Sequence, residues 1–283
     1  MTTLLVGFDS AWTADNLGAF VGVVRSGDGT MRELGPPQTV DFLKAGSAIV
    51  KWQDEHAPSV TIVLLDQPTI VPNPTGQRPV ENIVGSVVSL RYGGMQPASK
   101  SRSKMFGASA PVWPFLEWFG GAASSADAVA NTLVFETYPV LAMIALGWTL
   151  PDPSPRPRPT GRLPKYNPDR RKTFSISDWQ HVCGRASESF RKYGLMQIVS
   201  WIEDVAQKSP VLKPDQDKLD ACICLLVAVS LAERKLNLMV GDSLTGYIVV
   251  PHSAPLRREI VARCRATGRA PLEWMRVFRQ GAL

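Results

Sequence analysis

Three acidic residues directly follow apolar runs of strand length in this sequence: Asp9, Asp66 and Glu136. The carboxyl ends of parallel strands meet at one edge of a sheet, so we expect these side chains to converge. Converging carboxylates repel one another unless a cation neutralises them, and their hard oxygen atoms suit Mg²⁺ or Mn²⁺. Two such ions about 3.5–4 Å apart can activate water and stabilise the leaving oxygen in phosphodiester hydrolysis. The pattern predicts a metal-dependent catalytic site.

Each acid also has a plainer interpretation. Asp9-Ser10 and Asp66-Gln67-Pro68 are sequences typical of turns and helix caps. Glu136 fits that explanation less well, because it lies between Phe135 and Tyr138 in an apolar strand, where burying an unpaired carboxylate is costly.

A second acidic signal opens the apolar helix predicted over Gln216–Lys235. Asp217 and Asp220 are three residues apart and therefore share one helical face. An interaction with the helix dipole explains acids in the first turn, Asp217 among them. It does not explain Asp220, which leads into the most apolar part of the helix, so we expect this carboxylate to have a metal or a charged partner. The predicted metal ligands are Asp9, Asp66, Asp217 and Asp220.

The basic residues point weakly to a polyanionic partner such as DNA or RNA. The net charge is +6 and the pI is about 9.2. Basic residues gather in a Ser/Gly-rich stretch and in a Pro/Arg-rich loop at 151–172, where solvated, mobile loops explain them equally well. The candidates for phosphate contact are Arg78, Arg91, Lys100, Arg102 and Lys104.

The order of elements that would position these residues is typical of an α/β fold. Three short strands, a helix over Thr39–Glu55 and a fourth strand precede a long excursion and the strand that ends at Glu136. A further helix is predicted over Val80–Tyr92, a helical region in one or two pieces over Ser177–Gln207, and a late strand over Tyr247–Val250. We expect one domain over residues 1–283, a mixed sheet flanked by helices, with helical and loop insertions at about 67–131 and 150–175.

Other classes of protein fit the sequence poorly. No uncharged apolar stretch approaches the ~20 residues that cross a bilayer, and the N-terminus does not resemble a signal peptide. We therefore expect no membrane partner and a cytoplasmic location. Cys183, Cys222, Cys224 and Cys264 lack the paired spacing of a zinc site, which favours buried, reduced thiols.

Short segments along most of the chain, from Leu4 to about Pro251, resemble the domain of unknown function 429 family. The segments that carry the resemblance occur in the family's order: Gly7-Phe8-Asp9, Leu65-Asp66-Gln67-Pro68, Phe135-Glu136-Thr137-Tyr138-Pro139 and Asp217-Lys218-Leu219-Asp220-Ala221. Arg78-Pro79-Val80-Glu81 and Gly246–Pro251 look like further family segments. The family is described as predicted nucleases with an RNase H-like fold, so the resemblance implies that fold and, as a prediction, nuclease activity.

The helix opening Asp217-x-x-Asp220-Ala221 is also similar to the last acidic pair of RuvC-like Holliday-junction resolvases. By that similarity Asp9 and Asp66 would be strand-end ligands, and Asp217 and Asp220 the acids of the final core helix. Glu136 fits that nuclease pattern less well, and its implied role is to bind the metal, to position a metal ligand or to orient the substrate. Resolvases of this fold are often dimers, so a homodimer is a further expectation of the resemblance.

Two other functions remain open from the sequence. One is a nucleotide-binding phosphotransferase of the actin-like ATPase type, with Gly7-Phe8-Asp9-Ser10 beginning a phosphate loop. That group normally repeats its fold, and one copy is visible here. The other is a nucleic-acid-binding module without catalysis, in which the aromatic segment Val112–Phe119 stacks on bases. A helical face covering the core is the simpler explanation of that segment.

Overall fold

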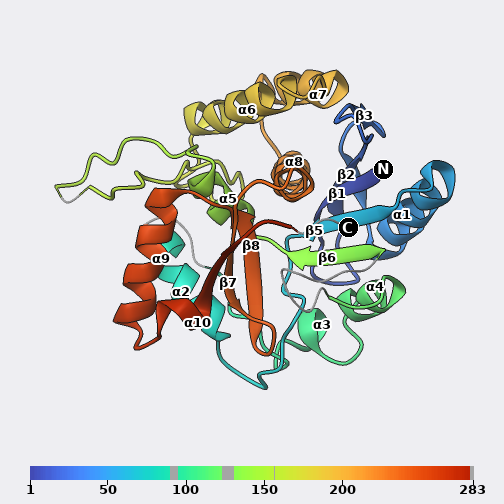
Figure 1. The fold of residues 1–283 in the computed structure, drawn as a ribbon. Coiled ribbons are helices and arrows are strands. Elements are labelled where there is room, and N and C mark those ends of the chain that lie inside the picture. The colour runs from blue at the N-terminus through green and yellow to red at the C-terminus, as the bar shows by residue number, and fades with distance from the viewer. Residues whose placement is uncertain (90–94, 123–130, 156, 281–283) are drawn as a thin grey trace.

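The computed structural model describes residues 1–89, 95–122, 131–155 and 157–280. Its centre is a mixed sheet (Figure 1). Strand β1 pairs antiparallel with β2 and parallel with β5, and β5 pairs parallel with β6. The short strands β3 and β4 both pair with β2, giving the order β3-β2-β1-β5-β6. This is the strand order of the RNase H-like fold, which confirms the predicted fold class. The strands are β1 (Thr3–Asp9), β2 (Gly18–Arg25), β3 (Met31–Glu33), β4 (Gln38–Val40), β5 (Val60–Leu65) and β6 (Thr132–Glu136).

Both faces of this sheet are covered, which is why β1 and β5 read as continuous apolar runs. Alternate side chains point to opposite faces. Leu5 packs in the cluster that contains α8 (Lys213–Ala232), whereas Phe8 packs in the cluster that contains α1 (Phe42–His56) and α4 (Val112–Trp118). Figure 1 shows α8 lying between the sheet and two outer helices, α6 (Ile176–Arg191) and α7 (Met196–Ala206).

Helix α8 approaches β1 very closely, and Gly7 makes this approach possible. A Cβ atom at Gly7 would lie 2.1 Å from the Ala221 carbonyl oxygen and 2.3 Å from the Leu225 nitrogen, both backbone atoms of α8. No side chain larger than hydrogen fits there. The glycine therefore sets how deeply α8 sits on the strand that ends at Asp9.

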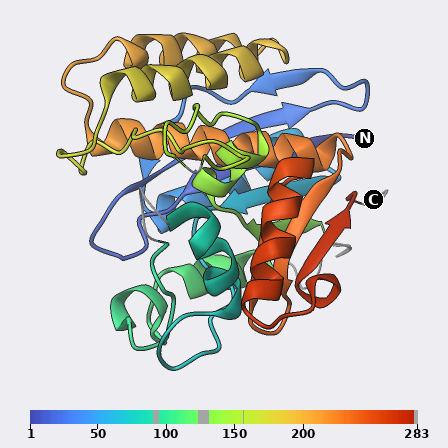
Figure 2. The same ribbon diagram turned by 90° about the vertical axis from the view of Figure 1, so that its left-hand side faces the viewer.

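A second, three-stranded antiparallel sheet lies beside the first. Its order is β8-β7-β9, and helices α2 and α9 contact each other next to it (Figure 2). The predicted strand Tyr247–Val250 is β8 and extends one residue further at each end, whereas β7 and β9 were not predicted. The elements are α2 (Pro79–Ser89), α9 (Ala254–Ala266), α10 (Pro271–Trp274), β7 (Asn237–Asp242), β8 (Gly246–Pro251) and β9 (Met275–Phe278).

Several predicted helix boundaries were wrong. The helix expected over Thr39–Glu55 starts at Phe42, because Gln38–Val40 pairs with β2 and Asp41 caps the helix by accepting a hydrogen bond from the Lys44 nitrogen at 2.7 Å. The last core helix starts at Lys213 instead of Gln216, since a proline is tolerated in a first helical turn.

The helical region predicted over Ser177–Gln207 is two helices, α6 (Ile176–Arg191) and α7 (Met196–Ala206). Gly194, between them, has a φ of +70°, which ends the first helix. Tyr92, at the predicted end of α2, lies outside the described residues. The other two helices are α3 (Ser103–Phe106) and α5 (Pro139–Ala145).

The expectations about membrane spans and about the cysteines can be compared with the structure. Within the described part of the chain, each helix is too short or too polar to cross a bilayer. The four cysteines are buried and form no disulfide, as predicted.

Candidate active site

All five predicted acidic site residues line one cavity of about 820 Å³. The cavity lies beyond the carboxyl ends of β1, β5 and β6. Both segments predicted as insertions contribute to its wall, the first through Met95, Gln96 and Met105 and the second through residues between Leu163 and Thr173.

The register of the parallel strands brings three of the acids to the same sheet edge. Phe8 pairs with Leu65, and Leu65 pairs with Glu136. The ladder continues one step further, because the Asp66 nitrogen donates to the Phe8 carbonyl at 2.9 Å. Asp9 and Asp66 therefore leave neighbouring strands at the same level, and α8 brings Asp217 and Asp220 to this edge.

The carboxylates of the cavity influence one another's ionisation. Burial and then the charges of Asp66, Asp220 and Asp217 raise the pKa of Asp9 well above its ordinary value. Burial and then the charge of Asp220 do the same to the pKa of Asp66, to which Glu136 and Asp217 also contribute. Mutual repulsion of this kind marks a site that gains free energy when a cation enters.

Asp220 is held in place by two neighbouring side chains. Tyr166 donates from its hydroxyl to Oδ1 at 2.7 Å, and Gln216 donates from Nε2 to Oδ2 at 2.8 Å. Burial raises the pKa of Asp220 to about 6, although Lys213, Tyr166 and Gln216 act to lower it. The carboxylate expected to need a partner therefore has two hydrogen-bond donors and sits beside a lysine.

That lysine, Lys213, is a positive charge among the acids. Its ammonium group forms an ion pair with Asp217, one helical turn further along α8. Burial lowers the pKa of Lys213, but Asp9, Asp217 and Asp220 together raise it above its ordinary value. Lys213 is thus charged and electrostatically bound to the acidic group.

Glu136 lines the cavity but is bound elsewhere. Arg78 donates to both of its carboxylate oxygens, from Nη1 at 2.8 Å and Nη2 at 2.6 Å, and the Thr69 nitrogen donates to Oε2 at 3.1 Å. Glu136 is 2% exposed. A buried guanidinium is therefore its partner, as the cost of burying it alone requires.

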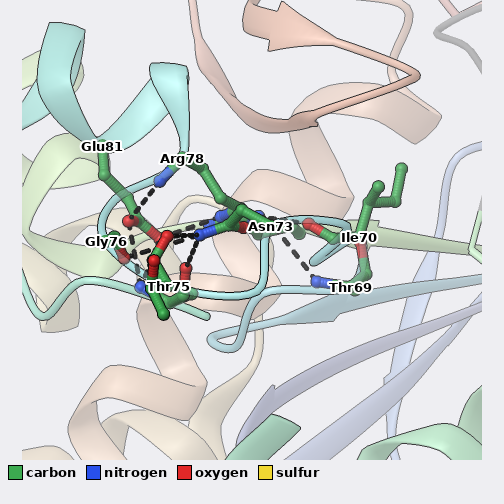
Figure 3. Close-up of polar contacts among 9 residues, drawn as sticks. Thr69, Ile70, Asn73, Thr75, Gly76, Arg78 and Glu81 are labelled. Atoms are coloured by element: carbon green, nitrogen blue, oxygen red, sulfur yellow. Dashed lines mark hydrogen bonds and ion pairs between the residues drawn. The ribbon is translucent and has the colours of Figure 1, made fainter. Parts of the chain in front are cut away.

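Arg78, predicted to contact phosphate, is buried in this network and reaches no solvent. It also donates from Nε to Glu81 Oε1 at 2.8 Å and from Nη1 to the Ile70 carbonyl at 3.0 Å. Figure 3 shows this loop, with Glu81 turned back toward Arg78 and Asn73 toward the Thr75 and Gly76 carbonyls. Because each nitrogen of its guanidinium is hydrogen-bonded inside the protein, Arg78 is a structural residue in this arrangement.

The other predicted phosphate contacts that the structure describes, Lys100, Arg102 and Lys104, do not line the cavity. Arg102 donates to Gln96 Oε1 at 2.8 Å, and Lys104 pairs with Asp15 at 3.3 Å on the surface. Lys100 is exposed, and Arg91 lies outside the described residues. Of the basic residues that the structure describes, those lining the cavity are Lys165, Arg170 and Lys213, which were not predicted as site residues. Their signal in the sequence was the Pro/Arg-rich loop and the Lys213-Pro214-Asp215 helix opening.

Two buried amide side chains in the cavity wall each leave one atom without a partner among the described residues. Gln67, with no exposed surface, accepts a hydrogen bond from the Ser10 hydroxyl, but its Nε2 has no acceptor. Gln216 is 6% exposed, and its Oε1 has no donor. Buried polar atoms are nearly always paired, so a water molecule or a ligand in the cavity supplies the partners of this donor and this acceptor.

The fit of a divalent cation to these residues has two sides. Within the described ranges, no three His, Cys, Asp or Glu side chains stand as a ready-made metal site. The donor chemistry nevertheless fits, because the carboxylates and the unpaired Gln216 oxygen beside Asp220 are hard oxygen ligands. The residues thus suit a cation once their side chains adjust around it.

Fold and cavity together define an RNase H-like α/β protein with an acidic cavity at the carboxyl edge of its sheet. The chain belongs to the family described as "Protein of unknown function (DUF429)", which it matches over residues 9–245. Among solved structures it is similar to T. thermophilus RuvC in complex with Holliday junction substrate. The two chains are 11% identical, the match covers 82% of this chain and 96% of that chain, and the TM-score is 0.32. No curated protein matches the chain.

Proposed function

We propose that the protein is a divalent-metal-dependent nuclease that hydrolyses phosphodiester bonds of DNA or RNA with Mg²⁺ or Mn²⁺. The observation that carries the proposal is one cavity that brings together Asp9, Asp66 and Asp220 from two strand ends and a helix. Burial and the charges of the neighbouring carboxylates raise the pKa of Asp9 and of Asp66 there. Such a cluster is costly in the metal-free protein and becomes favourable when cations neutralise it.

Each acid has a role in this proposal. Asp9 and Asp220 hold the metal most directly, and Asp66 and Asp217 complete the set. When bound, the metal neutralises phosphate charge and lowers the pKa of a water molecule. Tyr166 and Gln216 fix the orientation of the Asp220 carboxylate through their hydrogen bonds. Glu136 does not take part as a ligand, because its two oxygens are bound by Arg78.

The remaining cavity residues suit a phosphate group. Gln67 presents an unpaired amide donor, which a phosphate oxygen would satisfy. Lys165 and Arg170 line the same cavity and supply positive charge from the Pro/Arg-rich loop. We therefore move the proposed phosphate contacts from Arg78, Lys100, Arg102 and Lys104 to these three residues.

A cleavage panel tests the proposal. Single-stranded, duplex and branched DNA and RNA are incubated with Mg²⁺, Mn²⁺ or EDTA. Asp220→Asn keeps the shape of the side chain and removes its charge, and Asp204→Asn, at an exposed position of α7, is the matched control. We expect metal-dependent cleavage by the wild type and by Asp204→Asn, with at least a hundredfold loss in Asp220→Asn. Full activity of Asp220→Asn or Asp9→Asn contradicts the mechanism.

One observation favours a second candidate, a nucleic-acid-binding module without catalysis. No three acidic, His or Cys side chains of the described chain form a ready-made cation site. The aromatic platform considered for such a module is not available as a whole, because Phe115 and Phe119 are buried in the core and only Trp118 is substantially exposed, at 46%. Binding without cleavage under any divalent metal would support this candidate.

A further inference from the structure

The position of Lys213 is unusual for a cation. It is the first residue of α8, a helix of 20 residues, whose N-terminal end carries partial positive charge. The helix dipole therefore disfavours a lysine at this position. Its place in the structure is explained by what lies beside it, namely the carboxylate of Asp217 and the cavity shared with Asp9 and Asp220.

A neighbouring lysine shows what an ordinary ion pair at this helix start looks like. Lys208 pairs with Asp215 at 2.8 Å, and Asp215 also caps α8 by accepting a hydrogen bond from the Leu212 nitrogen. Neither residue lines the acidic cavity. Helix capping is therefore provided by Asp215, whereas Lys213 and Asp217 form their ion pair in the wall of the cavity.

A second observation marks this end of the cavity as a ligand position. Gln216 directly precedes Asp217 on α8, is almost completely buried and leaves its Oε1 without a donor among the described residues. Gln216 and Lys213 line the same cavity. An unpaired oxygen and a carboxylate held by a lysine are both groups that a metal ion would bind.

We propose that Lys213 is a built-in counter-cation, which neutralises the acidic cavity in the metal-free protein and releases Asp217 when a divalent cation binds. The inference rests on the proposed metal site and adds a residue that sets its affinity. Breaking the ion pair and placing a second cation near the ammonium group both subtract from the free energy of metal binding. A neutral residue at position 213 therefore strengthens metal binding and weakens the metal-free fold.

Calorimetric titration with Mn²⁺ and thermal unfolding in EDTA or Mn²⁺ test this on the full chain. For Lys213→Gln we expect about a tenfold lower Kd for Mn²⁺, a lower Tm in EDTA and a larger rise in Tm with Mn²⁺ than for the wild type. Lys213→Arg, which keeps the charge, restores the wild-type Kd. Lys208→Gln, the matched control outside the cavity, changes the Kd by less than about twofold.

The outcomes separate this inference from the proposed function. A wild type that binds Mn²⁺ with an affinity that Lys213→Gln leaves unchanged or weakens overturns the role of Lys213 alone. Binding by Lys213→Gln but not by the wild type supports it, and binding by neither overturns it together with the metal site. If Lys213→Gln is unfolded in EDTA, recovery of its circular dichroism signal in Mn²⁺ supports the inference, and failure to recover overturns it.

Discussion

The guanidinium of Arg78 holds the carboxylate of Glu136 through two hydrogen bonds of 2.8 and 2.6 Å, and both side chains are buried. Burial lowers the pKa of Arg78, but Glu136 and Glu81 raise it above its ordinary value, so the guanidinium remains charged. The pair joins the end of β6 to the loop before α2. It thereby fixes the wall of the cavity beside Asp66.

Breaking this pair will destabilise the protein strongly. Glu136→Gln leaves a buried guanidinium short of charge compensation, and we expect the free energy of unfolding to fall by about 3–5 kcal/mol. Urea unfolding measures the change. Glu188→Gln removes the partner of Arg185 in an exposed pair and is expected to cost less than about 1 kcal/mol. Similar losses in the two variants would show that the buried pair is not stabilising.

The acidic cavity makes the stability of the metal-free protein depend on pH. The pKa of Asp220 is about 6 in the folded protein against an ordinary 3.8, so the folded state holds the proton more tightly. Below about pH 4 Asp220 is protonated in both the folded and the unfolded protein and does not lower the free energy of unfolding. As pH rises from about 4 to about 6 stability is lost, by on the order of 2–3 kcal/mol.

Thermal unfolding in EDTA across this pH range checks the sign. We expect the Tm of Asp220→Asn to vary less with pH than the Tm of the wild type. Mn²⁺ binds the ionised carboxylates, so it should restore the lost stability at pH 7 and have little effect at pH 4. A Tm that rises between pH 4 and 6 by the same amount in the wild type and in Asp220→Asn would contradict the assignment.

Gln67 offers a test of substrate contact that is separate from stability. Gln67→Leu removes an unpaired buried donor but also the acceptor of the buried Ser10 hydroxyl, so we expect the free energy of unfolding to fall by about 1–3 kcal/mol. If its amide meets a phosphate oxygen, the rate of cleavage falls by about tenfold to a hundredfold. Kinetics at saturating Mn²⁺, together with urea unfolding, give both numbers. An unchanged cleavage rate would exclude this contact.

Gly7 tests how the helix and the strand position the acids. Gly7→Ala forces a methyl group against backbone atoms of Ala221 and Leu225, which must move. We expect a loss of about 3 kcal/mol or more and weaker Mn²⁺ binding, because α8 carries Asp217 and Asp220 away from Asp9. Gly184→Ala, in α6 with open space around it, is expected to stabilise by about 0.5–1 kcal/mol. A stable Gly7→Ala protein with normal metal affinity would contradict this account.

The fold and the acids were predictable from sequence because each depends on a local pattern. A buried parallel strand followed by an acid, as at Asp9 and Asp66, gives both the strand and the direction of the carboxylate. The sequence also indicated that Glu136 needs a partner. It did not identify Arg78, because that contact joins residues 58 positions apart and no periodicity links them.

Two other features escaped prediction for physical reasons. Strands Asn237–Asp242 and Met275–Phe278 are short and depend on pairing with each other, which a local pattern does not reveal. Lys165 and Arg170 lie in an irregular loop with several other basic residues, where nothing in the spacing tells which side chains face the cavity.

The contact between β1 and α8 joins the beginning of the chain to a helix near its end. Such long-range pairing slows folding, because a large loop must close before the contact is gained. During synthesis the N-terminal strands are finished long before α8 emerges, so the sheet face that α8 covers has nothing to pack against. The acidic cavity consequently assembles at a late stage of folding, and a growing chain that has not yet added Lys213 carries strand-end acids without their helical partners.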